Sequence, residues 1–137
     1  MPVAEINVIA GRTPEQKSKL LHAVSESVLE SLQVGRHALS VWLREFPREQ
    51  VLCPEGGNEH WMTIRITCFS GRTTQIKRQL YRCLAHRLEQ AGEDAGQCSI
   101  LVVDTPMENW GILGGQCAMD VLPPHRNTTE NEKGKES

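Results

Sequence analysis

The chain has 137 residues, of which 39% are hydrophobic, and it carries 15 Lys and Arg against 17 Asp and Glu. This length predicts one compact domain with its own core, and a net charge of −2 argues against a nucleic-acid partner, which normally selects a basic face. No apolar run approaches the roughly 18 residues of a membrane span, so no membrane partner is expected. Since the N-terminus lacks the basic and apolar regions of a signal peptide, we expect a cytoplasmic location.

The cysteines and histidines give no sign of a metal site. Five cysteines are an odd number for a disulfide framework, and no Cys-x-x-Cys pair is present. We interpret all five as small buried hydrophobic residues: Cys53, Cys68, Cys83, Cys98 and Cys117. The five histidines have no ligand spacing on a shared helix face, so we expect no bound metal.

The first predicted elements are a strand and a capped helix. Residues 3–9 form a short β-branched segment bounded by Gly11, which is typical of a strand that ends in a turn. Thr13 suits the N-cap, Pro14 suits the first helical position, and Gln16 completes a capping box with Thr13. The sequence therefore predicts a helix that begins directly after Thr13.

The body of this helix is amphipathic. Apolar residues recur at helical spacing along one face: Leu20, Leu21, Val24, Val28 and Leu32. The pattern predicts about five turns, which we expect to end at Gly35. A second strand is expected over 39–46, where apolar and polar residues alternate as they do when one face is buried.

The same series of elements then occurs a second time. The segment Gly71-Arg72-Thr73 repeats Gly11-Arg12-Thr13 sixty residues later. At this offset the identical pairs also include Ile6/Ile66, Lys17/Lys77 and Leu20/Leu80. Apolar character matches at five further pairs: Val8/Cys68, Ile9/Phe69, Val24/Leu84, Val28/Leu88 and Val41/Leu101. This agreement over strands and helix indicates an internal duplication.

The duplication predicts an α/β fold. A strand, a helix and a strand in that order form a β-α-β unit with parallel strands and a right-handed crossover. We expect the first unit over 2–52, a glycine-rich linker over 53–60 and the second unit over 61–121. Because one unit cannot cover its own sheet, two fused β-α-β units should form a four-stranded sheet backed by two helices.

Together these segments form a single predicted domain over 1–122. The sheet face away from the helices would still need a cover, so we expect the chain to oligomerise. The remaining residues, 123–137, are polar and follow a Pro-Pro pair, which favours a disordered tail.

The two ends of the domain carry the most specific motifs. Pro2 follows an initiator methionine, which is normally removed before a small residue, and its removal leaves a secondary amine at the start of a strand. The segment that begins at Pro2 reads PVAEINVIAGRTPEQK and strongly resembles the 4-oxalocrotonate tautomerase family, whose chains begin with a catalytic proline. Residues 102–115 read VVDTPMENWGILGG and look like that family's closing Glu-Asn-Trp-Gly-Ile-Gly-Gly segment with one extra residue.

The resemblance extends from Pro2 to about Val121 and implies the fold of the tautomerase superfamily. In that superfamily, short chains with one β-α-β unit assemble as hexamers, and double-length chains assemble as trimers. This chain is similar to the double-length type, which includes the malonate semialdehyde decarboxylases and the cis-3-chloroacrylic acid dehalogenases, so a cofactor-free homotrimer is expected. Since Met62 stands where the second half would need a proline, each chain should have one active site.

The resemblance also implies roles for Pro2, Arg72 and Trp110, and the repeat adds Arg12. Arg44 is a further candidate because it lies four residues after Ser40 on the same strand face. Pro2 would be the general base, because burial and a neighbouring guanidinium favour the neutral amine. Arg72 corresponds to an arginine that binds substrate carboxylates in double-length members, and Arg12 is its counterpart in the first half. Trp110 would form the apolar wall of the pocket, and Arg44 would supply a further contact to the small carboxylate substrate.

Several positions depart from the family's pattern. The arginine expected early in the second strand is replaced by Ser40, and by Ser99 in the repeat. The acidic residue of the decarboxylases falls near Ala38, and the first of their two arginines falls on Ser70. The water-activating carboxylate of the dehalogenases falls near Asp120.

The leading hypothesis is a tautomerase that transfers a proton on a small enol or 2-oxo carboxylate, with Pro2 as the base. The alternatives within enzymes are a malonate semialdehyde decarboxylase-like activity and a haloacrylate dehalogenase or hydratase activity. Another alternative is a non-catalytic binding protein like macrophage migration inhibitory factor, since a fold alone does not decide function. Structural roles are alternatives for Arg12 and Arg72, in capping a turn or pairing with an acid, and for Trp110, in the core.

Overall fold

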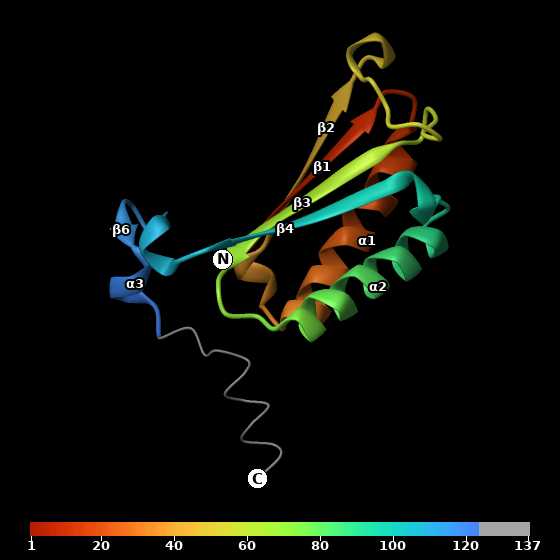
Figure 1. The fold of residues 1–137 in the computed structure, drawn as a ribbon. Coiled ribbons are helices and arrows are strands. Elements are labelled where there is room, and N and C mark those ends of the chain that lie inside the picture. Colours follow the sequence, from red (N-terminus) through yellow and green to blue (C-terminus); the bar gives the residue numbers. More distant parts are fainter. Residues whose placement is uncertain (124–137) are drawn as a thin grey trace.

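Four strands form one sheet, and two helices cover one of its faces (Figure 1). The computed structural model describes residues 1–123. The strands are β1 (Val3–Ile9), β2 (Ser40–Phe46), β3 (Met62–Phe69) and β4 (Cys98–Thr105). The helices are α1 (Pro14–Leu32) and α2 (Thr74–Gln90). The α/β class and the four-stranded sheet backed by two helices are as the sequence predicts.

The order of the strands follows from the duplication. The sheet runs β2-β1-β3-β4, with β1 parallel to β2, β3 parallel to β4, and β1 antiparallel to β3. Each half is therefore a β-α-β unit, and the two units meet along their first strands. Because these strands run in opposite directions, the start of β1 lies beside the end of β3, and the start of β3 lies beside the end of β1.

Helix α1 begins as predicted and ends earlier than predicted. Thr13 and Gln16 form both hydrogen bonds of the capping box, and Pro14 is the first helical residue. The expected end at Gly35 is wrong, since the helix ends at Leu32 and Gln33 takes the left-handed conformation with φ of 51°. Glycine and asparagine are the usual residues at this place, so a glutamine that takes their role cannot be identified from composition.

The second half is one residue shorter than the first half between its two strands. In the first half Val3 pairs with Ser40, and in the second half Thr63 pairs with Ser99. The offset is therefore sixty in the first strands and fifty-nine in the second strands. This corrects the predicted match of Val41 with Leu101, because Leu101 is 57% exposed on the face away from the helices.

The core lies between the sheet and the two helices. Its strand residues alternate along β1 and β3, and its helix residues come from the apolar faces of α1 and α2. The interpretation of the cysteines as buried holds for Cys68 alone; the other four are partly exposed, and all five thiols are free. Cys53 lies between β2 and β3 and Cys83 lies on α2, while Cys98 begins β4 at the edge of the core and Cys117 lies in β6 of the arm.

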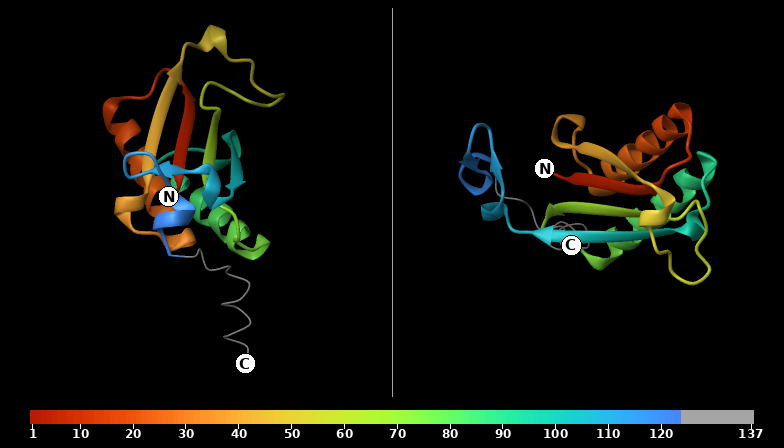
Figure 2. Two further views of the ribbon diagram at one scale, coloured as in Figure 1. Left: turned by 90° about the vertical axis from the view of Figure 1, so that its left-hand side faces the viewer. Right: turned by 90° about the horizontal axis from the view of Figure 1, so that it is seen from above.

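A short arm leaves the sheet after β4. It contains the hairpin β5 (Gly111–Ile112) and β6 (Gln116–Cys117), followed by α3 (Ala118–Val121). Figure 2 shows that the arm extends beyond the end of the sheet at which the N-terminus lies. The tail predicted over 123–137 falls, apart from Pro123, outside the described residues. Within residues 1–123, no helix has the length and apolar character needed to cross a membrane.

Candidate active site

The site is built where the chain begins. Pro2 is less than 2% exposed, and its carbonyl oxygen accepts a hydrogen bond from the Ser40 backbone N–H at 3.4 Å. Val3 pairs with Thr67 at the end of the antiparallel β1/β3 ladder, which places Pro2 beside Cys68 near the end of β3. Burial raises the pKa of the Cys68 thiol, so this neighbour is neutral at ordinary pH.

Arg72 lies at the same end of the sheet, in the turn between β3 and α2. Its Nη1 donates to the carbonyl oxygen of Phe69 at 3.0 Å. Burial, and then the positive charge of Arg72, lower the pKa of the amine of Met1 below its ordinary value. Arg72 has no acidic partner within residues 1–123, so a positive charge and a destabilised ammonium group stand together here.

Trp110 joins this end from the arm. Its ring meets that of Phe69 edge-on, with centroids 5.4 Å apart and planes at 85°. The backbone N–H of Trp110 donates to Met107, and its carbonyl accepts from Ala118. Phe69 thus contacts Trp110 through its ring and Arg72 through its carbonyl, so the three predicted residues Pro2, Arg72 and Trp110 are gathered at one end of the sheet.

Arg12 lies at the opposite end of β1 and has a different environment. The residue is 8% exposed, and its guanidinium donates from two nitrogens to the Glu93 carboxylate, with a shortest distance of 2.6 Å. A further N–H donates to the carbonyl oxygen of His60 at 3.1 Å. Burial, reinforced by Glu93, raises the pKa of the adjacent Cys98 thiol to about 12. The structure does not bring Arg12 to Pro2 within one chain.

The acid that pairs with Arg12 has no counterpart beside Arg72. Glu93 directly follows Gly92, the left-handed residue after α2, and the residue that directly follows left-handed Gln33 is Val34. Val34 packs against the core as a partly buried apolar residue. The two arginines therefore occupy equivalent turns, but only Arg12 has a carboxylate at the equivalent loop position.

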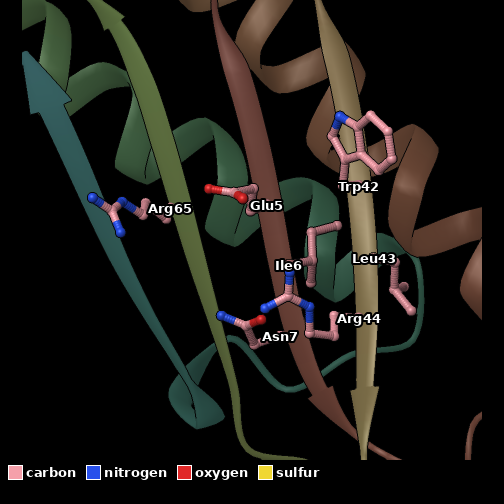
Figure 3. Close-up of a pocket in the computed structure, with 7 residues that line it drawn as sticks. All are labelled: Glu5, Ile6, Asn7, Trp42, Leu43, Arg44 and Arg65. Atoms are coloured by element: carbon pink, nitrogen blue, oxygen red, sulfur yellow. The ribbon is translucent and has the colours of Figure 1, made fainter. Parts of the chain in front are cut away.

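Arg44 lies in the middle of the face away from the helices, which we call the open face. Figure 3 shows it projecting from β2 beside Asn7 of β1, with Glu5 and Arg65 further along the same surface. These side chains border a shallow pocket of about 190 Å³. Arg44 pairs with Asn7, five residues along β1 from Pro2, so the chain by itself does not place it in the Pro2 site.

Ser40, at the predicted place of a family arginine, has its own partner. Its hydroxyl accepts a hydrogen bond from the indole N–H of Trp42 at 3.1 Å. Within residues 1–123, no group of three or more His, Cys, Asp or Glu side chains is arranged to hold a metal ion.

Sequence reasoning did not assign Phe69 and Glu93. Phe69 ends the strand that leads into the Arg72 turn, and an aromatic residue there is a usable signal because the chain has only two phenylalanines. Glu93 follows a glycine at a helix end, and only the packing of that loop against the β1 end shows what it binds.

Comparisons with known proteins agree with this architecture. One tautomerase enzyme profile matches residues 2–56, and a second profile, also of tautomerase enzymes, matches residues 44–113, about half of the chain. The 2-hydroxymuconate tautomerase of Pseudomonas sp. (strain CF600) is 40% identical over 48 residues, which are 35% of this chain and 76% of that protein. The probable tautomerase YusQ of Bacillus subtilis (strain 168) is 22% identical over 125 residues, which cover 87% of this chain and 98% of that protein.

Solved structures show the same fold over nearly the whole chain. The symmetric trimer of wild-type fused 4-OT superposes with a TM-score of 0.79 at 24% identity, covering 88% of this chain and 99% of that one. FG41 malonate semialdehyde decarboxylase inhibited by 3-bromopropiolate superposes with a TM-score of 0.77 at 17% identity, covering 89% and 99%. At these identities the likeness establishes the fold.

Proposed function

Because this chain belongs to the tautomerase family and is an isomerase-type enzyme, we propose that it transfers a proton on a small enol or 2-oxo carboxylate, with the amine of Pro2 as the base. The proposal includes removal of Met1, which turns the Pro2 nitrogen into a free secondary amine. The observation that carries it is the meeting of a buried N-terminus with an arginine that has no acidic partner within the described part of the chain.

The electrostatics of this end favour a neutral amine. Burial and the charge of Arg72 lower the pKa of the Met1 amine. After removal of Met1, we expect the same two causes to act on the Pro2 amine. A neutral amine accepts the proton of an enol hydroxyl and returns it to carbon. The opposite requirement, a protonated proline near neutral pH, belongs to the decarboxylase or hydratase alternative, which these causes disfavour.

Arg72 and Trp110 have complementary roles in the proposal. The guanidinium of Arg72 binds the substrate carboxylate and stabilises the negative charge that spreads over the enolate. Its anchor on the Phe69 carbonyl fixes the direction of the side chain. Trp110 packs on the Phe69 ring and gives the pocket an apolar wall. Proton transfer of this kind uses these side chains without a cofactor.

We further propose that the enzyme is a homotrimer. Fused 4-OT, which superposes over most of the chain, forms trimers. The open face of the sheet carries Trp42 at 65% exposure and Leu101 at 57%, which is apolar surface that a second copy would cover. Light scattering coupled to size exclusion should give three times the chain mass; a monomer at micromolar concentration would contradict the proposal.

The decisive experiment is an activity comparison with a defined N-terminus. Mass spectrometry of the purified protein should show Pro2 as the first residue. Ketonisation of 2-hydroxymuconate and of phenylenolpyruvate is followed by absorbance for the wild type and for Pro2→Ala, and the variant should lose about 100-fold or more of kcat/KM. Retained activity in Pro2→Ala would exclude the amine as base. Faster turnover of malonate semialdehyde than of either enol would favour the decarboxylase alternative.

A further inference from the structure

The indole N–H of Trp110 is a buried donor without a hydrogen-bond partner among the described residues. Buried polar groups are paired in the great majority of cases, and those that are not call for an explanation. The chain offers a direct contrast, because the indole N–H of the more exposed Trp42 donates to Ser40 at 3.1 Å. The two indole groups therefore differ in their surroundings: that of Trp42 has an acceptor within the chain, and that of Trp110 has none among the described residues.

The position of this donor connects it to the proposed site. Trp110 packs edge-on against Phe69, whose carbonyl holds Arg72. Continuing the β1/β3 pairing from Val3 and Thr67 by two residues sets Met1 across from Phe69. Removal of Met1, which the proposed function includes, takes the first residue away from this end of the sheet.

The chemistry of an indole limits what its partner can be. The N–H only donates, so it requires an acceptor such as a carbonyl, enolate or carboxylate oxygen. A donor held in a dry position stabilises an oxygen on which charge develops, because no reorganisation is needed when the charge forms. In a 2-oxo acid such an oxygen is one carbon away from the carboxylate, which is the group that the proposal gives to Arg72.

We propose that Trp110 donates its indole N–H to the 2-oxygen of the substrate while Arg72 holds the carboxylate. This inference rests on the proposed tautomerase function and adds to it a donor for the oxygen on which charge develops. In the reaction the Pro2 nitrogen takes the enol hydroxyl proton, and the electron pair moves along the conjugated chain. The carbon then takes the proton from the same nitrogen, and the 2-oxygen becomes a carbonyl. Trp110 keeps its proton throughout and stabilises the charged oxygen.

The first test separates the N–H from the ring. Trp110→Phe keeps an aromatic wall and removes the donor, so kcat for 2-hydroxymuconate should fall about 10- to 100-fold with KM within about threefold. The melting temperature should stay equal or rise, because a buried unpaired donor is lost. The matched control, Trp61→Phe, makes the same exchange directly before β3, at the opposite end of the sheet, and should keep the wild-type kcat. Unchanged kcat in Trp110→Phe would overturn the inference.

A second test reads the contact without relying on turnover. Inhibition by 2-oxopentanoate is compared with inhibition by pentanoate, which lacks the 2-oxygen. The wild type should prefer the oxo acid by about 10-fold, and Trp110→Phe should lose this preference while Trp61→Phe keeps it. If Trp110 is only an apolar wall, the variant weakens both inhibitors equally, and the inference fails.

A third measurement uses the wild-type protein and therefore remains possible if Trp110→Phe does not fold. In the ¹⁵N-labelled wild type, Trp42→Phe and Trp61→Phe identify two of the three indole signals, which leaves that of Trp110. Saturation with 2-oxopentanoate should move this signal downfield, and pentanoate should not. Equal shifts with both acids, or none, would overturn the role of Trp110. The proposed function fails separately, through an active Pro2→Ala enzyme or a wild type without tautomerase activity.

Discussion

At one end of the sheet Arg72 lies beside the N-terminus without an acidic partner in the described chain, whereas at the other end its counterpart Arg12 is bound to Glu93 at 2.6 Å. Both arginines follow the first strand of a β-α-β unit and precede a threonine that caps the next helix. The backbone setting is the same, so the difference in their environment comes from a few side chains.

Two substitutions between the halves account for the contrast. The strand beside Arg72 directly follows Pro2, whose nitrogen the proposed removal of Met1 turns into a free amine, while the strand beside Arg12 begins at the internal residue Met62. The loop beside Arg12 supplies an acid, and the equivalent residue in the other half is Val34. The duplicated unit therefore provides two geometrically related ends, of which one has an arginine paired with a carboxylate and the other an arginine without an acidic partner among residues 1–123.

The largest expected effect concerns the structural arginine. Arg12→Ala leaves the Glu93 carboxylate nearly buried without its cation, which should cost about 3–5 kcal/mol of unfolding free energy. Urea unfolding measures this loss. The double variant Arg12→Met with Glu93→Leu removes both charges and should recover most of the stability. A single variant as stable as the wild type would show that the ion pair does not hold this end together.

The next effect concerns the proposed functional arginine. Arg72→Ala should lower kcat/KM for 2-hydroxymuconate by about 100-fold, because a charge-assisted contact to the substrate carboxylate is lost. Its urea midpoint should stay close to that of the wild type, since Arg72 has no ion pair in the described chain. The proposed difference between the two arginines is contradicted if Arg72→Ala loses as much unfolding free energy as Arg12→Ala. It is also contradicted if both variants lose activity and neither loses stability.

An acid can be moved from one end to the other. Val34→Glu places a carboxylate at the loop position that corresponds to Glu93, where it should pair with Arg72 and lower kcat/KM by about 10-fold. Val34→Gln has nearly the same size without the charge and serves as the control for packing. Equal losses in the two variants would mean that volume, rather than charge, explains the effect.

The pH dependence of kcat/KM tests the charge of Arg72 apart from its contact with substrate. The base must be neutral, so kcat/KM rises with pH through the pKa of the Pro2 amine. Burial and the Arg72 charge lower the pKa of the N-terminal amine, and removal of that charge should raise it. The rising limb of Arg72→Gln should therefore lie at higher pH than those of Arg72→Lys and wild type. If the rising limbs of Arg72→Gln and the wild type coincide, the charge of Arg72 does not lower the pKa of the Pro2 amine.

The smallest expected effect compares the two helix caps. Thr13 accepts from the Gln16 N–H within a complete capping box, whereas Thr73 accepts from the Ile76 N–H without a reciprocal side chain. Thr13→Ala should cost about 1 kcal/mol of unfolding free energy, and Thr73→Ala should cost a few tenths less. Urea unfolding of both variants measures the difference, and a larger loss in Thr73→Ala would contradict it.

Local signals in the sequence predicted the elements and the fold. The capping box at Thr13, the helical spacing behind it and the sixty-residue repeat each depend on neighbours along the chain, and the structure has them as expected. The errors came where the repeat loses a residue. Neither Gly35 nor Leu101 takes its predicted place, because left-handed Gln33 ends α1 and the second half has the shorter connection.

By itself, then, the sequence determined two β-α-β units, a proline at position 2 and an arginine in each equivalent turn. Only the tertiary structure decided what each arginine faces, because the partners of Arg12 and Trp110 lie far away in the chain: Glu93 is 81 residues from Arg12, and Phe69 meets Trp110 across the end of the sheet. Such contacts depend on the antiparallel pairing of β1 and β3, which places the first residues of each strand beside the last residues of the other. Electrostatic compensation and ring packing act through space, so no pattern along the chain records them.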